Sequence, residues 1–429
     1  MDRIELNRAR AFKGEFSPPP DKSISHRSVI FSSLAKGTST VTNFLRANDT
    51  LSTINAFRSL GIDIIDEGST LTIQGKGLRG LSEPQDVIDC GNSGTTIRLI
   101  SGVLSGSPFF SVLTGDSSLR TRPMARVIKP LSLMGAHISA RDNNQYPPLA
   151  IKGGDLSPIK YIMPIASAQV KSALLLAGLY AGGDTEIMEP VKSRDHSEKM
   201  LSAFGADLTV KGLGITIRGG RELGALDTHV PGDFSSAAFF IVAALLIPGA
   251  EILVRDVGIN PTRTGLLTAL KNMGAAIEVS NIHDVSGEPV ADICCKGGST
   301  LKAVSVTGEL APSLIDEFPI LCVAAALAEG TTTIKGAGEL RVKESDRIKT
   351  IATELRKMGV EINEYPDGLS IKGAEGLRGA EVESHGDHRI AMAMSIAALM
   401  AEGKTIINGA SAVDISFPGF FDIIGRLSS

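Results

Sequence analysis

The sequence predicts a mixed α/β protein of two similar domains. Three observations support this prediction: the chain length, a helix–glycine–strand pattern that recurs along the chain, and a series of apolar helices that recurs at the same spacing. The 429 residues exceed the ~150 residues of an ordinary domain, so two or three domains are expected. With 43% hydrophobic and 21% charged residues, the composition is that of a folded globular protein and not of a disordered chain.

The first repeated element is an amphipathic helix that ends at a glycine and continues into a strand. Its copies read LGIDI, MGAHI, FGADL, MGAAIEV and MGVEI, with the glycines at Gly61, Gly135, Gly205, Gly274 and Gly359. Glycine is common directly after a helix because it adopts a positive φ without steric cost. Each copy is therefore expected to be a helix, a turn and a strand.

The second repeated element begins with small or polar residues and becomes an apolar helix. Its apolar portions begin at Val29, Ile97, Val170, Ala237, Ile320 and Ile390. Six units of about 71 residues account for the whole chain. In each unit the apolar helix is expected to be buried on most sides, and the amphipathic helix is expected to face outward.

The division into domains follows from the six units. The last unit ends in FPGFFDIIGRLSS without its glycine and strand, so the N-terminal residues are expected to supply that strand. One domain would contain residues 21–232, and the other residues 1–20 plus 233–429. The chain would cross between them near residues 18–20 and 231–232, which favours a hinge and an interdomain cleft. A repeat scaffold that only presents a surface is the alternative.

Charge and composition exclude several classes of function. The 43 basic and 47 acidic residues give a net charge of −4, which removes the electrostatic argument for nucleic-acid binding. The longest apolar run, residues 237–247, is well short of the ~20 residues that span a bilayer. Residues 1–10 carry charges of both signs, so no signal peptide and a cytoplasmic location are expected. The cysteines lack CxxC spacing and are expected to be reduced core residues: Cys90, Cys294, Cys295 and Cys322.

The starts of the apolar helices carry more polar residues than a cap needs. Four such segments are DKSISHR (21–27), CGNSGTTIR (90–98), SAQVK (167–171) and GDHR (386–389). Helix N-termini present unpaired N–H groups and partial positive charge, so several of them together would bind phosphate or carboxylate. Three basic loops add cations: RTRPM (120–124), KSRDH (192–196) and RVKESDR (341–347). The sequence contains neither a P-loop nor a strand-linked GxGxxG motif, so neither ATP nor a dinucleotide is indicated as a ligand.

Some of these residues also have a purely structural interpretation. Asp346 and Arg347 begin an amphipathic helix, where a solvated ion pair is the usual arrangement. Ser167 and Ser235 could be caps only.

Two further pairs of residues are candidates for metal binding or for catalysis. His385 and His388 could face one metal ion, but they have no cysteine partner, so no metal site is expected. Cys90 beside Asn92 could be a nucleophile, although its apolar surroundings in QDVIDCG favour a packed thiol.

Eight motifs in order along all six units resemble the family of 5-enolpyruvylshikimate-3-phosphate synthases, or 3-phosphoshikimate 1-carboxyvinyltransferases: DKSISHR, GNSGTTIR, RTRPM, SAQVKS, IDEFPI, RVKESDR, GDHRIAM and SFP. The resemblance implies two hinged domains, each of three βαβαββ units with internal helices in an inside-out α/β barrel. It also implies transfer of the enolpyruvyl group of phosphoenolpyruvate to the 5-hydroxyl of shikimate 3-phosphate, through a tetrahedral intermediate that expels phosphate, in chorismate and aromatic amino-acid biosynthesis. No cofactor, metal, nucleic acid or membrane is implied, and a monomer is expected.

The resemblance further implies the ligand contacts. For shikimate 3-phosphate these are Lys22, Ser23, Arg27, Ser167, Ala168, Gln169, Ser193, Arg194, Asp316 and Lys343. For phosphoenolpyruvate they are Lys22, Asn92, Gly94, Arg122, Gln169, Arg347, His388 and Arg389. The last two arginines would grip the carboxylate as bidentate pairs.

The reaction needs a base for the hydroxyl proton and an acid for the methylene carbon, on opposite sides of the reacting bond. By the same resemblance, Asp316 is the expected base and Glu344 the expected acid. Lys22 is the third expected catalytic residue, and the division of proton roles between Lys22 and Glu344 stays open.

The chain departs from some family members at three positions: Ala168 replaces a serine, Ile415 a lysine and Glu339 an asparagine. These differences leave individual ligand contacts open. Gly94 leaves room beside the phosphoenolpyruvate site, so the inhibitor glyphosate could fit there.

Two other functions are alternatives. UDP-N-acetylglucosamine 1-carboxyvinyltransferase has a similar fold and chemistry, but its reactive cysteine should lie in a loop where this chain has no cysteine between Cys90 and Cys294. A non-enzymatic sugar-phosphate-binding protein is the other alternative. A nucleic-acid enzyme is disfavoured because only 4% of residues are aromatic, and none is Trp.

Overall fold

The computed structural model describes residues 2–308 and 310–428, and its contacts divide the chain into two compact units. Unit 1 comprises Met1–Pro19, Pro231–Asp284 and Pro289–Ser429, and unit 2 comprises Pro20–Val230 and Val285–Glu288. The chain therefore passes four times from one unit to the other, whereas the sequence pattern predicted two crossings. The additional crossings arise because a short hairpin tip, Val285–Glu288, belongs to unit 2.

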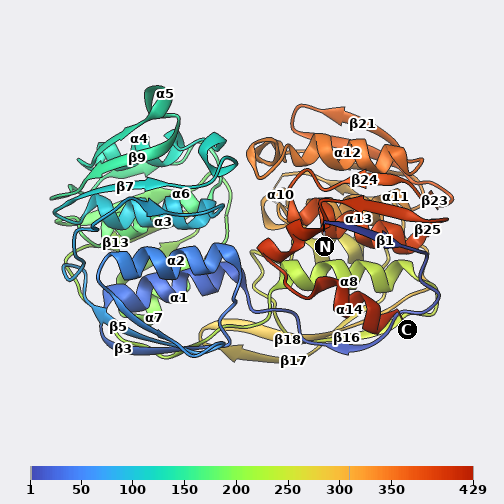
Figure 1. Cartoon of the computed structure of the whole chain (residues 1–429), viewed down its shortest axis with the longest axis horizontal. Helices are drawn as coiled ribbons and strands as arrows, with labels where there is room; N and C mark the ends of the chain where they lie inside the picture. Colours follow the sequence, from blue (N-terminus) through green and yellow to red (C-terminus); the bar gives the residue numbers. More distant parts are fainter. Residues whose placement is uncertain (1, 309, 429) are drawn as a thin grey trace. The chain divides into compact units, whose positions relative to one another are not determined.

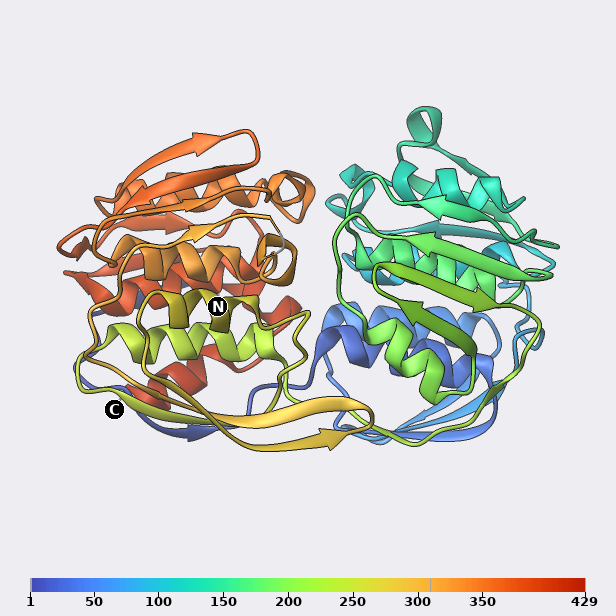
Figure 2. The same cartoon turned by 180° about the vertical axis from the view of Figure 1, so that it is seen from behind.

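Unit 2 repeats one arrangement of strands three times. Its strands are β3 (Ala35–Thr42), β4 (Asp63–Asp66), β5 (Leu71–Lys76), β6 (Ile88–Asp89), β7 (Phe110–Thr114), β8 (His137–Ala140), β9 (Tyr146–Lys152), β10 (Lys160–Ile162), β11 (Asp184–Met188), β12 (Asp207–Lys211), β13 (Gly214–Arg218), β14 (Leu223–Gly224) and β15 (Thr228–His229). The sheets have the orders β14-β3-β5-β4, β6-β7-β9-β8 and β10-β11-β13-β12, with β15 also paired to β3. In each sheet a short strand runs parallel to its neighbour, and β15 also runs parallel to β3, whereas the remaining pairs are antiparallel. Figure 2 shows the third of these sheets in green.

Unit 1 follows the same plan. Its strands are β1 (Arg3–Leu6), β2 (Lys13–Phe16), β16 (Glu251–Gly258), β17 (Ile277–Val285), β18 (Glu288–Lys296), β19 (Ser305–Val306), β20 (Thr331–Ile334), β21 (Glu361–Tyr365), β22 (Gly368–Lys372), β23 (Leu377–Arg378), β24 (Glu381–Glu383), β25 (Ala401–Glu402) and β26 (Thr405–Asn408). The sheets have the orders β17-β18-β16-β2, β19-β20-β22-β21 and β1-β26-β24, with a separate β23-β25 pair. The mixed α/β fold predicted from the sequence is confirmed.

The N-terminal strand completes the last sheet of unit 1. β1 runs antiparallel to β26, with Arg3 opposite Asn408 and Leu6 opposite Thr405. β24 pairs in parallel with the other side of β26. β1 is therefore the antiparallel neighbour of β26, as β9 is of β7 and β13 is of β11. Unlike β9 and β13, β1 comes from the opposite end of the chain.

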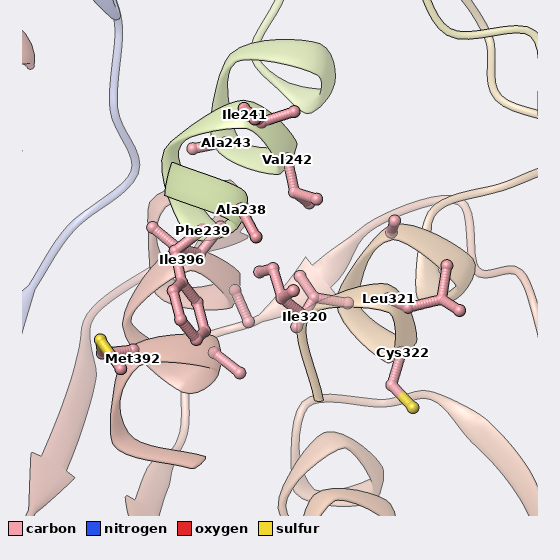
Figure 3. Packing of buried hydrophobic residues seen from close by; sticks show 14 of the residues in the cluster. Ala238, Phe239, Ile241, Val242, Ala243, Ile320, Leu321, Cys322, Met392 and Ile396 are labelled. Atoms are coloured by element: carbon pink, nitrogen blue, oxygen red, sulfur yellow. The ribbon is translucent and has the colours of Figure 1, made fainter. Parts of the chain in front are cut away.

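The six apolar helices form the interiors of the two units. They are α1 (Lys22–Leu34), α3 (Gly94–Ser105) and α6 (Ala168–Gly178) in unit 2, and α8 (Phe234–Leu246), α11 (Phe318–Ala326) and α13 (His388–Met400) in unit 1. All 13 residues of α13 are buried. Figure 3 shows apolar side chains of α8, α11 and α13 packed together, and Figure 1 shows these helices within unit 1. The buried hydrophobic residues form two separate clusters, one in each unit.

The second set of helices is amphipathic, as predicted. These helices are α2 (Asn48–Ser59), α4 (Ala125–Leu133), α7 (His196–Ala203), α9 (Gly265–Asn272), α12 (Arg347–Lys357) and α14 (Phe420–Leu427). Shorter pieces are α5 (Arg141–Asn144), α10 (Leu310–Ser313), η1 (Leu119–Thr121), η2 (Gly338–Val342) and η3 (Ala410–Ile415). α14 buries only Phe420, Ile424 and Leu427, which recur at helical spacing. None of the described helices combines the length and apolar character that a membrane span requires.

The glycines of the first repeat end five of these amphipathic helices. Gly61, Gly135, Gly205, Gly274 and Gly359 have φ values between +85° and +102°. A residue with a Cβ rarely adopts this backbone conformation. The prediction of a glycine-capped helix followed by a strand is therefore confirmed at these positions.

Candidate active site

The start of α1 places the DKSISHR residues. Asp21 caps the helix and accepts a hydrogen bond from the Ile24 N–H at 2.8 Å. Lys22 Nζ lies 3.1 Å from Asp49 Oδ2 on α2. Arg27 is buried, and its guanidinium donates to the Ser197 and Ser172 hydroxyls, each at 2.8 Å, and to the Ser23 carbonyl at 3.0 Å. Arg27 therefore links α1 to α6 and α7.

The pKa of His26, in the same segment, is lowered well below its usual value, mainly by burial and also by the positive charges of Lys22 and Arg27. His26 Nδ1 contacts the Thr53 hydroxyl at 2.7 Å. The ring is therefore neutral near pH 7 and adds no charge to this helix start.

The start of α3 carries two guanidinium groups close together. Asn92 donates to Asp116 at 2.7 Å and accepts from Arg122, whose side chain is buried. A Cβ added at Gly94 would lie 2.7 Å from Arg98 Nη1 and 3.2 Å from Arg122 Nη1. A side chain at this position would therefore crowd both guanidinium groups, and the expectation that glyphosate fits beside Gly94 stays a prediction. Two cations at a helix N-terminus form a strong anion site.

Arg98 also joins this group to the start of α6. Its Nη1 donates to Gln169 Oε1 at 2.7 Å, and Gln169 Nε2 donates to Thr95 at 3.1 Å. Arg98 belongs to the GNSGTTIR motif but is not among the predicted site residues. Its position one turn after Gly94 was the available signal, because residues four apart share a helix face.

Ser167 and Ala168 lie at the N-terminus of α6. Ser167 is the N-cap, and its hydroxyl accepts from the Val170 N–H at 3.5 Å, a long contact. Ser193 is buried in the loop before α7, and both its N–H, at 3.2 Å, and its hydroxyl donate to Glu189 Oε1. Arg194 is half-buried in the same loop.

Unit 1 brings together Asp316, Glu344, Arg347 and Arg389. Arg347 is only 1% exposed, and its guanidinium donates to Glu344 at 2.6 Å, to Asp316 at 3.3 Å and to Asp387 at 2.8 Å. Arg389 Nη1 donates to the Asp316 carbonyl at 3.0 Å, and its Nη2 lies 3.5 Å from Asp316 Oδ2. We call these five residues the arginine cluster.

The electrostatics of the arginine cluster keep Arg347 charged. Burial opposes its charged form, but the carboxylates of Asp387, Glu344 and Asp316 outweigh burial and raise its pKa above the usual value. Every guanidinium nitrogen of Arg347 already has a carboxylate partner. A ligand carboxylate can therefore bind Arg347 bidentately only by displacing one of these partners.

Asp387 was not among the predicted site residues. It is fully buried, caps α13 by accepting from the Arg389 N–H at 2.9 Å, and accepts from Ser345 at 3.0 Å. Its position directly before α13 in GDHR indicated a cap, but its bond to Arg347 depends on two segments 40 residues apart. A sequence pattern does not reveal such a pairing.

Two expected site residues of unit 1, Lys343 and His388, and one position of departure, Ile415, lie outside the arginine cluster. Lys343 Nζ lies 3.8 Å from Glu339 Oε2, a residue that departs from some family members. His388 is buried in the first turn of α13. Ile415, another departure, is half-buried at the end of η3.

Two structural interpretations of polar residues are corrected. Ser235 is not a cap: Asp233 caps α8, and the Ser235 hydroxyl accepts from Arg263 at 2.7 Å and donates to Glu317. Asp346 caps α12 but pairs with Arg341 at 2.8 Å, so it does not form a solvated pair with Arg347.

The cysteines are free, and all except the half-buried Cys294 are fully buried. Burial raises the pKa of Cys90, so its thiol is packed and not activated as a nucleophile. His385 Nε2 lies 2.9 Å from Glu354. In the described part of the chain, no group of three or more His, Cys, Asp or Glu side chains could hold a metal ion.

Comparison with known proteins agrees with this arrangement. The model of the family "EPSP synthase (3-phosphoshikimate 1-carboxyvinyltransferase)" matches residues 6–424. A 3-phosphoshikimate 1-carboxyvinyltransferase of Thermodesulfovibrio yellowstonii is 56% identical over 100% of both chains, and one of Geobacter sp. strain M21 is 54% identical over 99% of both. An EPSP synthase structure from Acinetobacter baumannii has a TM-score of 0.88 at 47% identity, covering 99% of this chain and 98% of that one. The resemblance seen in the motifs is confirmed, and the chain belongs to the EPSP synthase family.

Proposed function

We propose that this protein is a 3-phosphoshikimate 1-carboxyvinyltransferase of aromatic amino-acid biosynthesis. It transfers the carboxyvinyl group of phosphoenolpyruvate to the 5-hydroxyl of shikimate 3-phosphate and releases phosphate. The family match over residues 6–424 carries this proposal. Relatives with this name and 54–56% identity over nearly the whole chain support it.

The two substrates each carry a phosphate and a carboxylate, so binding requires several preplaced cations and N–H donors. In unit 2, the proposed contacts of shikimate 3-phosphate are Lys22, Ser23, Arg27, Ser167, Ala168, Gln169, Ser193 and Arg194. The proposed contacts of the phosphoenolpyruvate phosphate are Asn92, Gly94 and Arg122, to which the geometry adds Arg98 because it shares the Gly94 helix start. Lys22 and Gln169 are proposed to reach both substrates.

In unit 1, Arg347 and Arg389 are proposed to bind the carboxylate of phosphoenolpyruvate, with His388 beside them, and Lys343 is proposed to contact shikimate 3-phosphate. The ligand carboxylate would take the place of Glu344 on Arg347, since that guanidinium has no unused nitrogen. A carboxylate that loses its cation accepts a proton more readily. Binding of phosphoenolpyruvate would thus prepare Glu344 to protonate C3.

Asp316 is the proposed base for the 5-hydroxyl proton. In the addition step, the hydroxyl oxygen forms a bond to C2 while C3 gains a proton. In the elimination step, C3 loses a proton, the C2–C3 double bond returns and the C2–O bond to phosphate breaks. Asp316 would keep its contact with the Arg347 guanidinium when the ligand displaces Glu344, so Arg347 can stabilise the negative charge of Asp316 before it accepts the hydroxyl proton.

We further propose that the two units are the two domains predicted from the sequence, residues 1–20 plus 233–429 and residues 21–232. Each would form three βαβαββ units with internal helices, an inside-out α/β barrel, and the pair would close over the substrates. A cytoplasmic monomer without a cofactor completes the proposal. The repeated sheet order within each unit supports the three-unit plan.

Phosphate release from phosphoenolpyruvate by the purified protein tests the function. The acceptors to compare are shikimate 3-phosphate, UDP-N-acetylglucosamine and none. Release only with shikimate 3-phosphate is expected. Release with the nucleotide sugar would assign the other carboxyvinyltransferase activity, and release with neither acceptor would favour a non-catalytic sugar-phosphate-binding protein.

A further inference from the structure

Lys171 of α6 is a fully buried lysine held by two carboxylates. Its Nζ lies 2.9 Å from Glu189 Oε2 and 2.6 Å from Glu198 Oε1, and the three side chains are 0%, 2% and 6% exposed. A lysine is buried this deeply only when its charge is paired, because an isolated ammonium is costly to remove from water. None of the reaction steps above uses these three residues.

Lys171 and Glu189 together hold Ser193. Glu189 Oε1 accepts from both the N–H and the hydroxyl of Ser193, and Lys171 Nζ donates to the Ser193 carbonyl at 3.4 Å. The backbone of this loop residue is thus held on both sides by one buried ion pair. Arg194 follows directly, so its backbone position depends on the same pair.

The same lysine is tied to the start of α6. The Lys171 N–H donates to the Ser167 carbonyl at 3.0 Å, as the helical turn requires. Ser167 and Ala168 stand at this helix start, and Ser193 and Arg194 stand in the loop. One buried ion pair therefore sets the position of the loop relative to the helix N-terminus.

We propose that Lys171 and Glu189 are positioning residues for the phosphate group of shikimate 3-phosphate. This inference rests on the proposed function. The pair holds the Ser193–Arg194 loop at a fixed distance from the N-terminus of α6, so that donors from both segments meet one phosphate. Preorganised donors of this kind bind an anion without the cost of ordering the loop.

The bonds of Glu189 also explain how Ser193 can serve a ligand. The single hydroxyl proton of Ser193 goes to Glu189, so it is not available to a phosphate in this arrangement. If the hydroxyl turned to a phosphate, Glu189 would keep the Ser193 N–H and the Lys171 ammonium. The carboxylate would stay satisfied, so the turn would not leave it without partners.

Glu198 provides a matched control. It contacts the same lysine from α7 and is buried like Glu189, but the contacts described for it do not include Ser193. Burial raises the pKa of its carboxyl, although Lys171 opposes the shift. A role limited to pairing the buried lysine predicts equal effects for the two glutamates, whereas a positioning role predicts an effect of Glu189 alone.

The test compares Glu189→Gln with Glu198→Gln in the full-length enzyme. Glu189→Gln is expected to raise the KM for shikimate 3-phosphate about tenfold or more, with kcat and the KM for phosphoenolpyruvate within about threefold of wild type. Glu198→Gln is expected to leave kcat and both KM values within about threefold of wild type. Both variants are expected to melt at a lower temperature than wild type. If Glu189→Gln does not fold, Glu189→Asp and Glu198→Asp replace the pair.

Equal effects of the two substitutions, or no effect of Glu189→Gln on the KM for shikimate 3-phosphate, would overturn the inference while leaving the proposed function intact. A wild-type protein that does not turn over shikimate 3-phosphate would overturn both.

Discussion

At the scale of single residues, the arginine cluster concentrates charge where it is costly to bury. Arg347 is 1% exposed and contacts three carboxylates, of which Asp387 is fully buried. Removing one partner of such a group leaves an unpaired buried charge, a loss of about 3–5 kcal/mol. Substitutions in the cluster should therefore preserve charge or shape if catalysis is to be separated from folding.

Arg347→Lys keeps the charge but loses the planar fork that matches a carboxylate. We expect the KM for phosphoenolpyruvate to rise more than about tenfold, with a much smaller change in the Kd for shikimate 3-phosphate. Steady-state kinetics and calorimetry measure these two quantities. Arg341→Lys is the matched control, since Arg341 also binds a carboxylate, Asp346 at 2.8 Å, outside the cluster. Equal losses for both substrates would contradict the role given to Arg347.

Glu344→Gln keeps the size of the side chain but removes its ability to give and take a proton. We expect kcat to fall by about 100-fold or more. Binding of phosphoenolpyruvate should persist, because the ligand carboxylate no longer competes with a charged Glu344 for Arg347. Single-turnover rates and equilibrium binding measure both effects. A rate near that of wild type would remove Glu344 from the mechanism.

At the scale of elements, apolar helices begin at polar caps and amphipathic helices end at glycines. Asp21, Ser93, Asp233 and Asp387 each accept a backbone N–H at a helix start. These caps satisfy donors that would otherwise be buried without partners. The positions that could bind substrate anions are thus the same positions that local helix chemistry makes polar.

Gly359 follows α12 with a φ of +94°, and a Cβ there would have no atom within 4 Å. Gly359→Ala should therefore destabilise through backbone conformation alone, by about 1–2 kcal/mol. The control is Gly425→Ala inside α14, which also has open space and no positive φ. It should stabilise by up to about 1 kcal/mol. Urea unfolding measures the change in the free energy of unfolding of each variant. A loss of stability in both variants would show that the positive φ of Gly359 is not the cause.

Glu354 ties α12 to the segment before α13. Burial opposes its charged form, but hydrogen bonds from Lys357, His385 and the Glu383 N–H lower the pKa of its carboxyl below the usual value. A lowered pKa means that this stabilisation is present above the unfolded-state pKa and is lost as the pH falls through the folded-state pKa.

Glu354→Gln should accordingly lower the melting temperature clearly at about pH 7 and much less at about pH 3. The matched control is Glu361→Gln, which removes an exposed pair with Lys372 and should change little at either pH. Calorimetry at the two pH values distinguishes them. If Glu354→Gln lowers the melting temperature by the same amount at both pH values, the charge of Glu354 is not the source of the stabilisation.

At the scale of the whole molecule, each unit has its own hydrophobic cluster and its own set of sheets. Unit 1 is discontinuous, because β1 and β2 come from the N-terminal end of the chain. Stability of β26 should therefore depend on residues that are about 400 positions away in sequence, for example Ile4, which lies opposite Ile407.

Deleting residues 2–6 removes β1 and exposes one edge of β26. We expect faster amide hydrogen exchange in β26 and α13, with little change in the sheets of unit 2, because the two clusters are separate. Hydrogen exchange with mass spectrometry measures this. Ile4→Asp in the intact chain is a second, milder variant. Loss of protection spread evenly through both units would show that they unfold as one.

The sequence by itself determined the mixed α/β fold, the repeated helices, the positive-φ glycines and the family, because each of these depends on local periodicity, local backbone conformation or an ordered set of motifs. Only the tertiary structure decided that Arg347 contacts Asp387, that Arg98 contacts Gln169 at the start of α6, and that Lys171 holds Ser193 through Glu189. Each of these contacts joins separate segments of the chain. Their partners are selected by packing and by the cost of burying an unpaired charge, and no local pattern contains that information.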